Sequence, residues 1–318
     1  MRAQRVSATR GLDEAAPALS SCLLPVPSGR CRHPRQANRT TRLASMRPLN
    51  DSGDRMSVTF ALSDAHVGVV TLNRAAKLNA MNHDVFTGLH DAAAAARNAI
   101  DEGRCRAVLV IGDGRAFSAG LDVSLFAAQA AGEAPTDDWI AWLQQAFTHY
   151  EDLPVPTIAA VRGPAIGAGC QLAIACHLRI GATDASLGLL EARWGLVPDL
   201  GGTWRLPRVI GLSRATDLAM SGRTIDAPTA SQWGLLDAIA PEGHDFSTWA
   251  HEYAARLAAG PTVALGAVPA LLRNSYRQDR EAALAAERDA QQRCLKSEDF
   301  REAAAAGMEG RPPSFCGR

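Results

Sequence analysis

The pattern of hydrophobic and polar positions changes sharply at about residue 56. In residues 1–56, Arg, Ser and Pro are scattered without a helical or strand period, and acidic residues are few. Such a segment buries too little apolar surface to offset the entropy of ordering it. Three interpretations are compatible with residues 1–56. The segment could be an organelle transit peptide, a secretory leader interrupted by Pro25 and Pro27, or an extension ahead of a start at Met56. We expect a disordered, Arg-rich extension.

From residue 57 onward, apolar positions repeat with the periods of strands and helices. Two β-rich runs, VTFALSD and VGVVTLN, flank a polar turn and predict an antiparallel hairpin. Apolar residues at helical spacing predict a helix over 83–100. The next predicted elements are a strand in CRAVLVIG, a helix at 137–150, a strand in TIAAVRG, a helix after Gly163 and a strand in LRIGA. Strands alternating with helices indicate an α/β core, which we place at 57–250.

Beyond Gly211 the pattern becomes mainly helical. The last long segment, at about 278–306, is rich in Ala, Glu, Arg and Gln. We therefore expect a C-terminal helical subdomain over 251–318. Its helices would either cover the chain's own core or close a subunit interface.

Charge and cysteine content narrow the class of protein. The chain has 33 basic and 33 acidic residues, so its net charge gives no reason to expect nucleic acid or an anionic membrane surface as a partner. No run approaches the roughly 20 apolar residues that span a bilayer. Seven cysteines without a C-x-x-C pair favour a reducing compartment over disulfides or a zinc site. We expect a cytoplasmic protein without a bound metal.

Two short stretches of small residues are candidates for chemistry. FSAGLD (117–122) and GPAIGAG (163–169) each lead from a strand into a turn or helix, where backbone N–H groups have nothing bulky in front of them. An N–H at a helix start carries partial positive charge and suits an anion. Either stretch alone is weak evidence, but two such donors aimed at one point would form an oxyanion hole.

Five stretches together resemble, in order, the signatures of the enoyl-CoA hydratase/isomerase (crotonase) superfamily. They are GVVTLNRAAKLNAMN, GDGRAFSAGLDV, VRGPAIGAGCQLAIACHLRIG, LGLLEARWGLVPDLGGTWRLPRVIG and SGRTIDAPTASQWGLLDAIAP. The likeness runs from about residue 57 to 315. It implies a crotonase-like spiral of repeated ββα units, an acyl-CoA substrate with no separate cofactor, and a homo-oligomer that is a trimer or a dimer of trimers.

The resemblance also assigns candidate site residues. The oxyanion-hole donors would be the backbone N–H groups of Leu121 and Ala168. Hydratases of the family use two glutamates, and the matching positions here hold Gln171 and Glu191. The residues expected to lie against the acyl-CoA are Ala119, Leu121, Asp122, Val123, Ser124 and Ala168.

The amide at position 171 changes the expected chemistry. An amide can orient water but cannot take its proton, so hydration would need another carboxylate. Asp199, eight residues after Glu191, matches a position where some isomerases of the superfamily carry their catalytic acid. Two mechanisms stay open: isomerisation by proton transfer between carbons, and hydration in which Glu191 and Asp199 divide the acid and base roles while Gln171 positions water.

Simpler interpretations exist for the same residues. Glu191 would be a surface acid if it paired with Arg193 or Arg205, and Asp199 would only cap the turn in PDLGG. Asp122 would cap a turn. We expect structural roles for His83 and His177, and core or pocket-wall positions for Trp194, Trp204 and Trp233.

The function expected from the sequence is therefore that of an enoyl-CoA hydratase or isomerase of fatty acid metabolism. It would act through an oxyanion-stabilised enolate with carboxylate acid–base catalysis. The alternatives are another reaction of the superfamily, such as thioester hydrolysis or decarboxylation, and a non-catalytic acyl-CoA-binding protein.

Overall fold

The structure, a computed structural model, describes residues 56–125 and 136–318. The predicted N-terminal extension therefore lies almost wholly outside the described residues. The elements are β1 (Val58–Leu62), β2 (Val67–Leu72), η1 (Ala75–Lys77), α1 (His83–Asp101), β3 (Ala107–Gly112), α3 (Asp137–Glu151), β4 (Thr157–Val161), β5 (Pro164–Ile166), α4 (Ala168–Ala175), β6 (Leu178–Gly181), β7 (Ser186–Gly188), η2 (Glu191–Trp194), α5 (Gly202–Ile210), α6 (Leu212–Ser221), β8 (Ile225–Asp226), α7 (Ala227–Trp233), β9 (Ala238–Ile239), α8 (Phe246–Ala258), α9 (Thr262–Ser275), α10 (Arg280–Lys296) and α11 (Glu298–Glu309).

The larger sheet has the strand order β1-β2-β3-β4-β6-β9. β1 and β2 pair antiparallel, which confirms the predicted hairpin, and every later pairing in this sheet is parallel. A second sheet, of order β5-β7-β8, consists of strands of two or three residues. The predicted α/β class is confirmed. The small sheet was not predicted, because such short strands carry no readable period.

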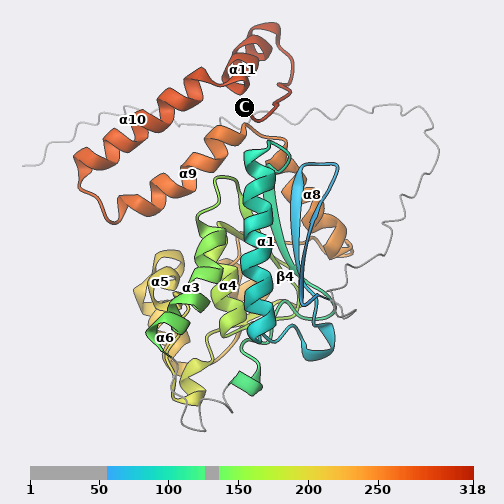
Figure 1. Cartoon of the computed structure of the whole chain (residues 1–318), viewed down its shortest axis with the longest axis vertical. Coiled ribbons are helices and arrows are strands. Elements are labelled where there is room, and N and C mark those ends of the chain that lie inside the picture. Colours follow the sequence, from blue (N-terminus) through green and yellow to red (C-terminus); the bar gives the residue numbers. More distant parts are fainter. Residues whose placement is uncertain (1–55, 126–135) are drawn as a thin grey trace, which may run out of the picture. The chain divides into compact units, whose positions relative to one another are not determined.

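Alternate residues of β3 face two different helical layers. Val108 and Val110 belong to the core cluster shared with α1, α3 and α4, whereas Ala107 and Leu109 belong to the cluster shared with α8. The central strands are thus buried on both faces, as parallel strands between helical layers usually are. Figure 1 shows α1, α3 and α4 with the strands, and α8 among the C-terminal helices.

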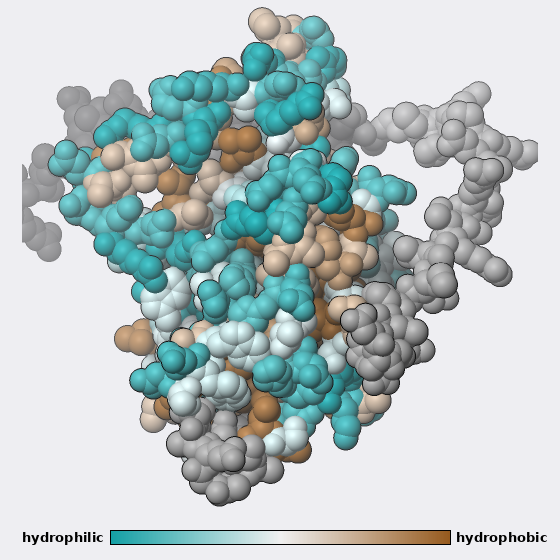
Figure 2. Space-filling view, in the orientation of Figure 1, coloured by the Kyte–Doolittle hydropathy of each residue, from teal (hydrophilic) through white to brown (hydrophobic). Residues whose placement is uncertain are grey.

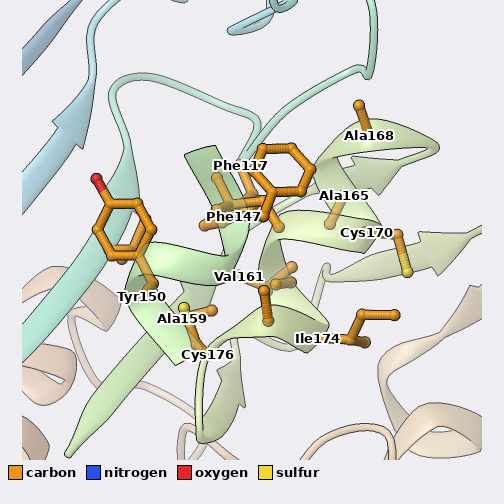
Figure 3. Packing of buried hydrophobic residues seen from close by; sticks show 14 of the residues in the cluster. Phe117, Phe147, Tyr150, Ala159, Val161, Ala165, Ala168, Cys170, Ile174 and Cys176 are labelled. Atoms are coloured by element: carbon orange, nitrogen blue, oxygen red, sulfur yellow. The ribbon is translucent and has the colours of Figure 1, made fainter. Parts of the chain in front are cut away.

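α4 is enclosed along its whole length. All eight of its residues are buried, and its apolar side chains pack with those of α3 and β4 (Figure 3). Unlike α1 and α3, which begin with Asn82 and Thr136 accepting hydrogen bonds from their first turns, α4 begins at Gly167 without a side-chain cap. Its amino end is therefore held in place by packing and keeps free N–H groups.

The C-terminal region is helical, as predicted. The segment at about 278–306 contains two helices, because Ser297 adopts ψ 154° and its hydroxyl accepts from the Phe300 N–H at 3.0 Å to start α11. The predicted boundary at residue 250 falls inside α8, which packs on the larger sheet. In the view of Figure 2, the part that carries α10 and α11 is mostly hydrophilic.

Length and hydropathy give little sign of a membrane-spanning helix. Across the described ranges, no single helix is both long and apolar enough to cross a bilayer. The pair α8 and α9 meets that criterion only when the two are taken together, and they are bent by 98°.

Candidate active site

A cavity of about 440 Å³ lies where α3, the turn after Ser118, the start of α4 and the segment 190–200 meet. Its size is typical of small-molecule sites. The cavity contains seven of the nine residues that the sequence singled out, which are Ala119, Leu121, Val123, Ala168, Gln171, Glu191 and Asp199. Segments as far apart as residues 119 and 199 therefore meet at one place, as the sequence predicts.

The amide of Leu121 is free, while its two neighbours are engaged. The Gly120 N–H donates to the Ser118 hydroxyl at 3.2 Å. The Asp122 N–H donates to the Met81 carbonyl at 2.9 Å. The Leu121 N–H has no acceptor within the part of the chain that the structure describes, and Leu121 lines the cavity.

The start of α4 offers a second free amide. The Gly167 N–H donates to the Gly188 carbonyl at 2.9 Å, and the first bond within the helix runs from the Gln171 N–H to the Gly167 carbonyl. Between them the Ala168 N–H has no acceptor among residues 56–125 and 136–318. Gly167 adopts φ 53° and ψ −119°, a conformation that only glycine takes up readily, and this geometry directs the chain into the helix.

Glycine lets the two turns touch. A Cβ at Gly169 would lie 2.6 Å from the Ser118 carbonyl oxygen, so no larger residue fits there. A Cβ at Gly120 would lie 2.8 Å from the Ile166 carbonyl oxygen and 3.7 Å from the Ala168 nitrogen. The free amides of Leu121 and Ala168 therefore belong to two backbone segments in direct contact, on the wall of one cavity.

Gln171 holds three chain segments together. Its Oε1 accepts from the Leu200 N–H and the Gly202 N–H, each at 2.9 Å. Because both donors point at one atom, that atom is the carbonyl oxygen, and Nε2 faces Glu191 Oε1 at 2.7 Å. The side chain is 1% exposed. Both lone pairs of the amide oxygen are in use, so Gln171 ties the segments of Glu191 and Asp199 to α4.

Glu191 has one carboxylate oxygen without a partner. Oε1 accepts from Gln171, whereas Oε2 is buried with no hydrogen bond to any described residue. Burial raises the pKa of Glu191, and the negative charge of Asp199 raises it further. The alternative pairing with Arg205 does not occur, because Arg205 bonds Glu151 at 2.6 Å. Glu191 thus combines a raised pKa with an unpaired carboxylate oxygen on the wall of the cavity.

Asp199 lines the same cavity, and the pKa of its carboxyl group is raised like that of Glu191. Burial raises the pKa of its carboxyl group. Its own carbonyl accepts from Gln144 Nε2 at 2.6 Å, which fixes this loop to α3. Glu191 and Asp199 are the ionisable side chains of the cavity wall, as far as the described residues go.

Asp122 and Ser124 do not line the cavity. The Asp122 carboxylate bonds Arg74 at 2.9 Å and accepts from both the amide and the hydroxyl of Ser124. These hydrogen bonds, first the Ser124 amide and then Arg74, lower the pKa of Asp122. The geometry is that of the turn cap named above as the simpler interpretation.

The sequence analysis missed the apolar wall of the cavity. Trp139, Ile140 and Leu143 of α3 line it, as do Leu196 and Val197 after η2. The signal available was the apolar excess at the start of α3, but a helical period alone does not distinguish a cavity wall from a core-facing stripe.

The two histidines and Trp194 lie where the sequence suggested. His177 accepts from the Thr157 N–H at 3.1 Å through Nδ1, and its Nε2 meets the Glu151 carbonyl, so it joins the end of α4 to β4 and α3. His83 stacks on Trp142 with ring centroids 5.0 Å apart. Trp194 forms part of the cavity wall. Within the described ranges, no group of three or more His, Cys, Asp or Glu side chains is arranged to hold a metal ion.

Comparison with known proteins identifies the family of the chain. The family model described as enoyl-CoA hydratase/isomerase matches residues 63–318. A Rhodobacter capsulatus protein named as an enoyl-CoA hydratase is 35% identical over 82% of this chain and 98% of its own length. The 1,2-epoxyphenylacetyl-CoA isomerase of Escherichia coli K12 is 33% identical over 81% of this chain and 99% of its own.

A solved structure extends the comparison to the fold. A Thermobifida fusca YX protein, assigned as an enoyl-CoA hydratase and solved in complex with acetoacetyl-CoA, is 34% identical, with a TM-score of 0.66 over 76% of this chain and 95% of its own. The expected crotonase-like architecture is therefore confirmed. With its family model, its relatives and its fold in agreement, this chain is an enzyme of the enoyl-CoA hydratase/isomerase family, within the crotonase superfamily.

Proposed function

We propose that the chain shifts the double bond of an enoyl-CoA by moving a proton between two carbons of the acyl group. In this reaction a carboxylate removes a proton from the carbon next to the thioester or from the far end of the allylic system. The electron pair of the broken C–H bond moves onto the thioester oxygen as an enolate. Return of a proton at the other carbon re-forms the C=O bond and leaves the double bond displaced, so no atom is gained or lost overall.

The observation that carries the proposal is the hydrogen bonding of Gln171. Its oxygen is saturated by two backbone amides and one of its N–H groups is given to Glu191. Only a single N–H remains for a water molecule. The wall around it offers two carboxyl groups with raised pKa values, Glu191 and Asp199. This arrangement suits proton transfer to and from carbon better than activation of water.

The thioester oxygen would be held by the amides of Leu121 and Ala168. Both are free and both border the cavity. Preorganised donors of this kind act where negative charge develops, and each typically contributes about 10² to 10³ in rate. Glu191, with its unpaired Oε2, would be the base, and Asp199 would be the acid that returns a proton.

Hydration is the second candidate function. It is supported by the relative named as an enoyl-CoA hydratase and by the presence of two carboxyl groups rather than one. In that reaction Glu191 would take the proton of water while Asp199 protonated the carbon next to the thioester. Acyl-CoA as the ligand is supported by the acetoacetyl-CoA bound to the relative from Thermobifida fusca YX. In either reaction coenzyme A would be part of the substrate, and no separate cofactor would be needed.

A product assay separates the two functions. Purified protein is incubated with a 3-enoyl-CoA or with the matching 2-enoyl-CoA, and products are identified by mass and by chromatography. The proposal predicts interconversion of the two isomers, with little 3-hydroxyacyl-CoA. Predominant formation of the hydroxy product, which is 18 mass units heavier by one water molecule, would favour hydration instead. If neither substrate reacts, both enzymatic proposals fail.

The rate should depend on pH in a bell-shaped manner. Because Glu191 must be ionised to act as the base, the rate falls as the pH drops through its pKa, which burial has raised. Because Asp199 must be protonated to return the proton, the rate also falls as the pH rises through its own raised pKa. Both limbs should lie above the ordinary range of carboxyl groups. Measuring kcat/KM from about pH 4 to 9 tests this, and Asp199→Asn should remove the limb on the basic side.

Assembly into a homo-oligomer is also proposed, with the C-terminal helices at the interface. Support comes from exposed apolar side chains on and just after α9, namely Val268, Leu272 and Tyr276. They border a cavity of about 490 Å³ between α9 and the end of α4. Burial of such a surface against another copy would stabilise a trimer or a dimer of trimers.

A further inference from the structure

Arg205 of α5 carries a buried charge, and all three nitrogens of its guanidinium donate hydrogen bonds. The residue is 7% exposed. Its Nε and Nη2 donate to Glu151 Oε2 at 3.0 and 2.6 Å, and Nη2 also donates to the Thr148 hydroxyl at 3.2 Å. Its Nη1 donates to the Leu200 carbonyl at 3.0 Å. One end of the guanidinium therefore bonds α3, and the other end bonds the segment that follows Asp199.

The turn formed by residues 200–202 is held on its other side by Gln171. The N–H groups of Leu200 and Gly202 both donate to Gln171 Oε1. The Leu200 carbonyl, which lies between these two N–H groups along the chain, accepts from Arg205. All three of these hydrogen bonds are buried. The turn thus presents two N–H groups to one side chain and a carbonyl to the other.

Two glycines let both side chains approach the turn closely. Gly201 adopts φ 87°, and a Cβ there would collide with Arg205 Nη1 and lie 2.9 Å from its Cζ. A Cβ at Gly202 would lie 2.8 Å from Gln171 Oε1 and 2.9 Å from the Pro198 Cβ. Glycine tolerates a positive φ and has no Cβ. The turn is therefore shaped to fit Arg205 on one side and Gln171 on the other.

The hydrogen bonds continue from the turn to Glu191. Because the turn engages the oxygen of the Gln171 amide, Nε2 faces Glu191 and donates to Oε1 at 2.7 Å. A reversed amide would set oxygen against carboxylate and N–H against N–H, so the turn fixes which end faces the acid. Burial raises the pKa of Glu191, and the hydrogen bond from Gln171 opposes that rise. Arg205 is thus linked to the proposed base through Leu200 and Gln171.

The charge of Arg205 is paired outside the active-site cavity. Glu151, the last residue of α3, lies 2.6 Å from Nη2, and the two side chains are 7% and 12% exposed. Neither Arg205 nor Glu151 lines the cavity. Any influence of Arg205 on a bound substrate would therefore pass through the turn, by position rather than by charge.

We propose that Arg205 is a positioning residue for Glu191, the proposed base. It holds the turn 200–202 in the form that fixes the Gln171 amide, and the amide holds Glu191 so that Oε2 stays free for the substrate. The proposal rests on the proposed acid–base chemistry and adds to it a residue from outside the cavity wall. Without the bond to Leu200 the turn relaxes, the amide reorients, and Glu191 is no longer held in one position.

Arg205→Lys removes the guanidinium fork and keeps the positive charge. A single ammonium group can pair with Glu151, but it cannot also reproduce the separate bond from Nη1 to the Leu200 carbonyl. We expect kcat/KM to fall at least about tenfold, the usual effect of losing a hydrogen bond to a charged group. Arg208→Lys is the matched control on the same helix, because the Arg208 guanidinium bonds the Trp204 carbonyl and stacks on the Trp204 ring. It should leave kcat/KM unchanged.

The protonation of Glu191 gives a readout that a purely structural role would not change. Infrared difference spectroscopy detects the C=O band of the protonated carboxyl group, and the loss of this band in Glu191→Gln identifies it. In Arg205→Lys the hydrogen bond from Gln171 is weakened, so the carboxylate is less stabilised and the pKa of Glu191 should move to higher pH. The acidic limb of kcat/KM should move in the same direction. Arg208→Lys should titrate as the parent does.

A second variant acts on the same bond from the other side. Gly201→Ala places a methyl group where Nη1 now lies and displaces the guanidinium from the Leu200 carbonyl without changing any charge. It should shift the Glu191 titration in the same direction as Arg205→Lys. This variant carries the test if Arg205→Lys does not fold.

The outcomes separate this inference from the proposed function, because the titration needs no turnover. A Glu191 titration that Arg205→Lys leaves in place would overturn the inference, even if the variant unfolds at a lower temperature. An equal shift in Arg208→Lys would indicate general loosening and would also overturn it. A shift confined to Arg205→Lys and Gly201→Ala, in a protein that does not isomerise enoyl-CoA, would support the inference and remove the proposed reaction.

Discussion

Glu191→Gln is expected to lower kcat on an enoyl-CoA by about 10² to 10⁴-fold, the usual contribution of a general acid–base group. The new amide has nearly the shape of the carboxylate, and its oxygen can still accept the hydrogen bond from Gln171 Nε2. The change therefore removes the proton acceptor and leaves the surroundings in place. Steady-state kinetics with the preferred isomer measure the loss, and binding of octanoyl-CoA checks that the cavity is intact.

Asp199→Asn is the matched comparison. If Asp199 only returns a proton, this variant should retain measurable exchange of the substrate's acidic proton with deuterated water, while isomerisation falls. Exchange should vanish in Glu191→Gln. A Glu191→Gln enzyme with kcat within about tenfold of the parent would contradict the assignment of Glu191 as the base.

Ala168→Pro is expected to lower the rate by about 10² to 10³-fold by removing one donor to the thioester oxygen. Ala168 is the first residue of α4, a position where proline fits because its missing N–H makes no bond within the helix. The ring would also occupy the space in front of the lost N–H. Kinetics measure the effect, and circular dichroism and thermal unfolding report on the fold.

Ala168→Gly serves as the control, because it keeps the N–H and removes only a methyl group. If the amide is the functional group, the glycine variant should stay within about tenfold of the parent, far above the proline variant. Two variants of equal activity would show that the Ala168 amide does not stabilise the transition state.

The sequence predicted the segments of the site but not the bonds within it. The helix at 83–100 followed from its apolar period, and the amides of Leu121 and Ala168 followed from the resemblance to the family. The role of Gln171 did not, because its partners Leu200 and Gly202 lie 29 and 31 residues away. No local pattern specifies a contact that depends on how distant loops pack.

Asp122 has a partner that no local pattern predicts. The resemblance assigns it to the residues against the acyl-CoA, and in the structure its carboxylate bonds Arg74, 48 residues earlier in the chain. The apolar side chains of α3 were missed for a related reason. A helix has the same period whether its hydrophobic stripe meets a core or a cavity, so the difference appears only in the folded chain.

The brevity of α4 has a consequence for how the enzyme acquires its activity. An isolated helix of eight residues is unstable in water, and this one also starts on an uncapped glycine. It therefore exists only when the neighbouring layers have closed around it. If the two amides act as proposed, they are brought together only by global folding, and we expect a partly unfolded polypeptide to be inactive.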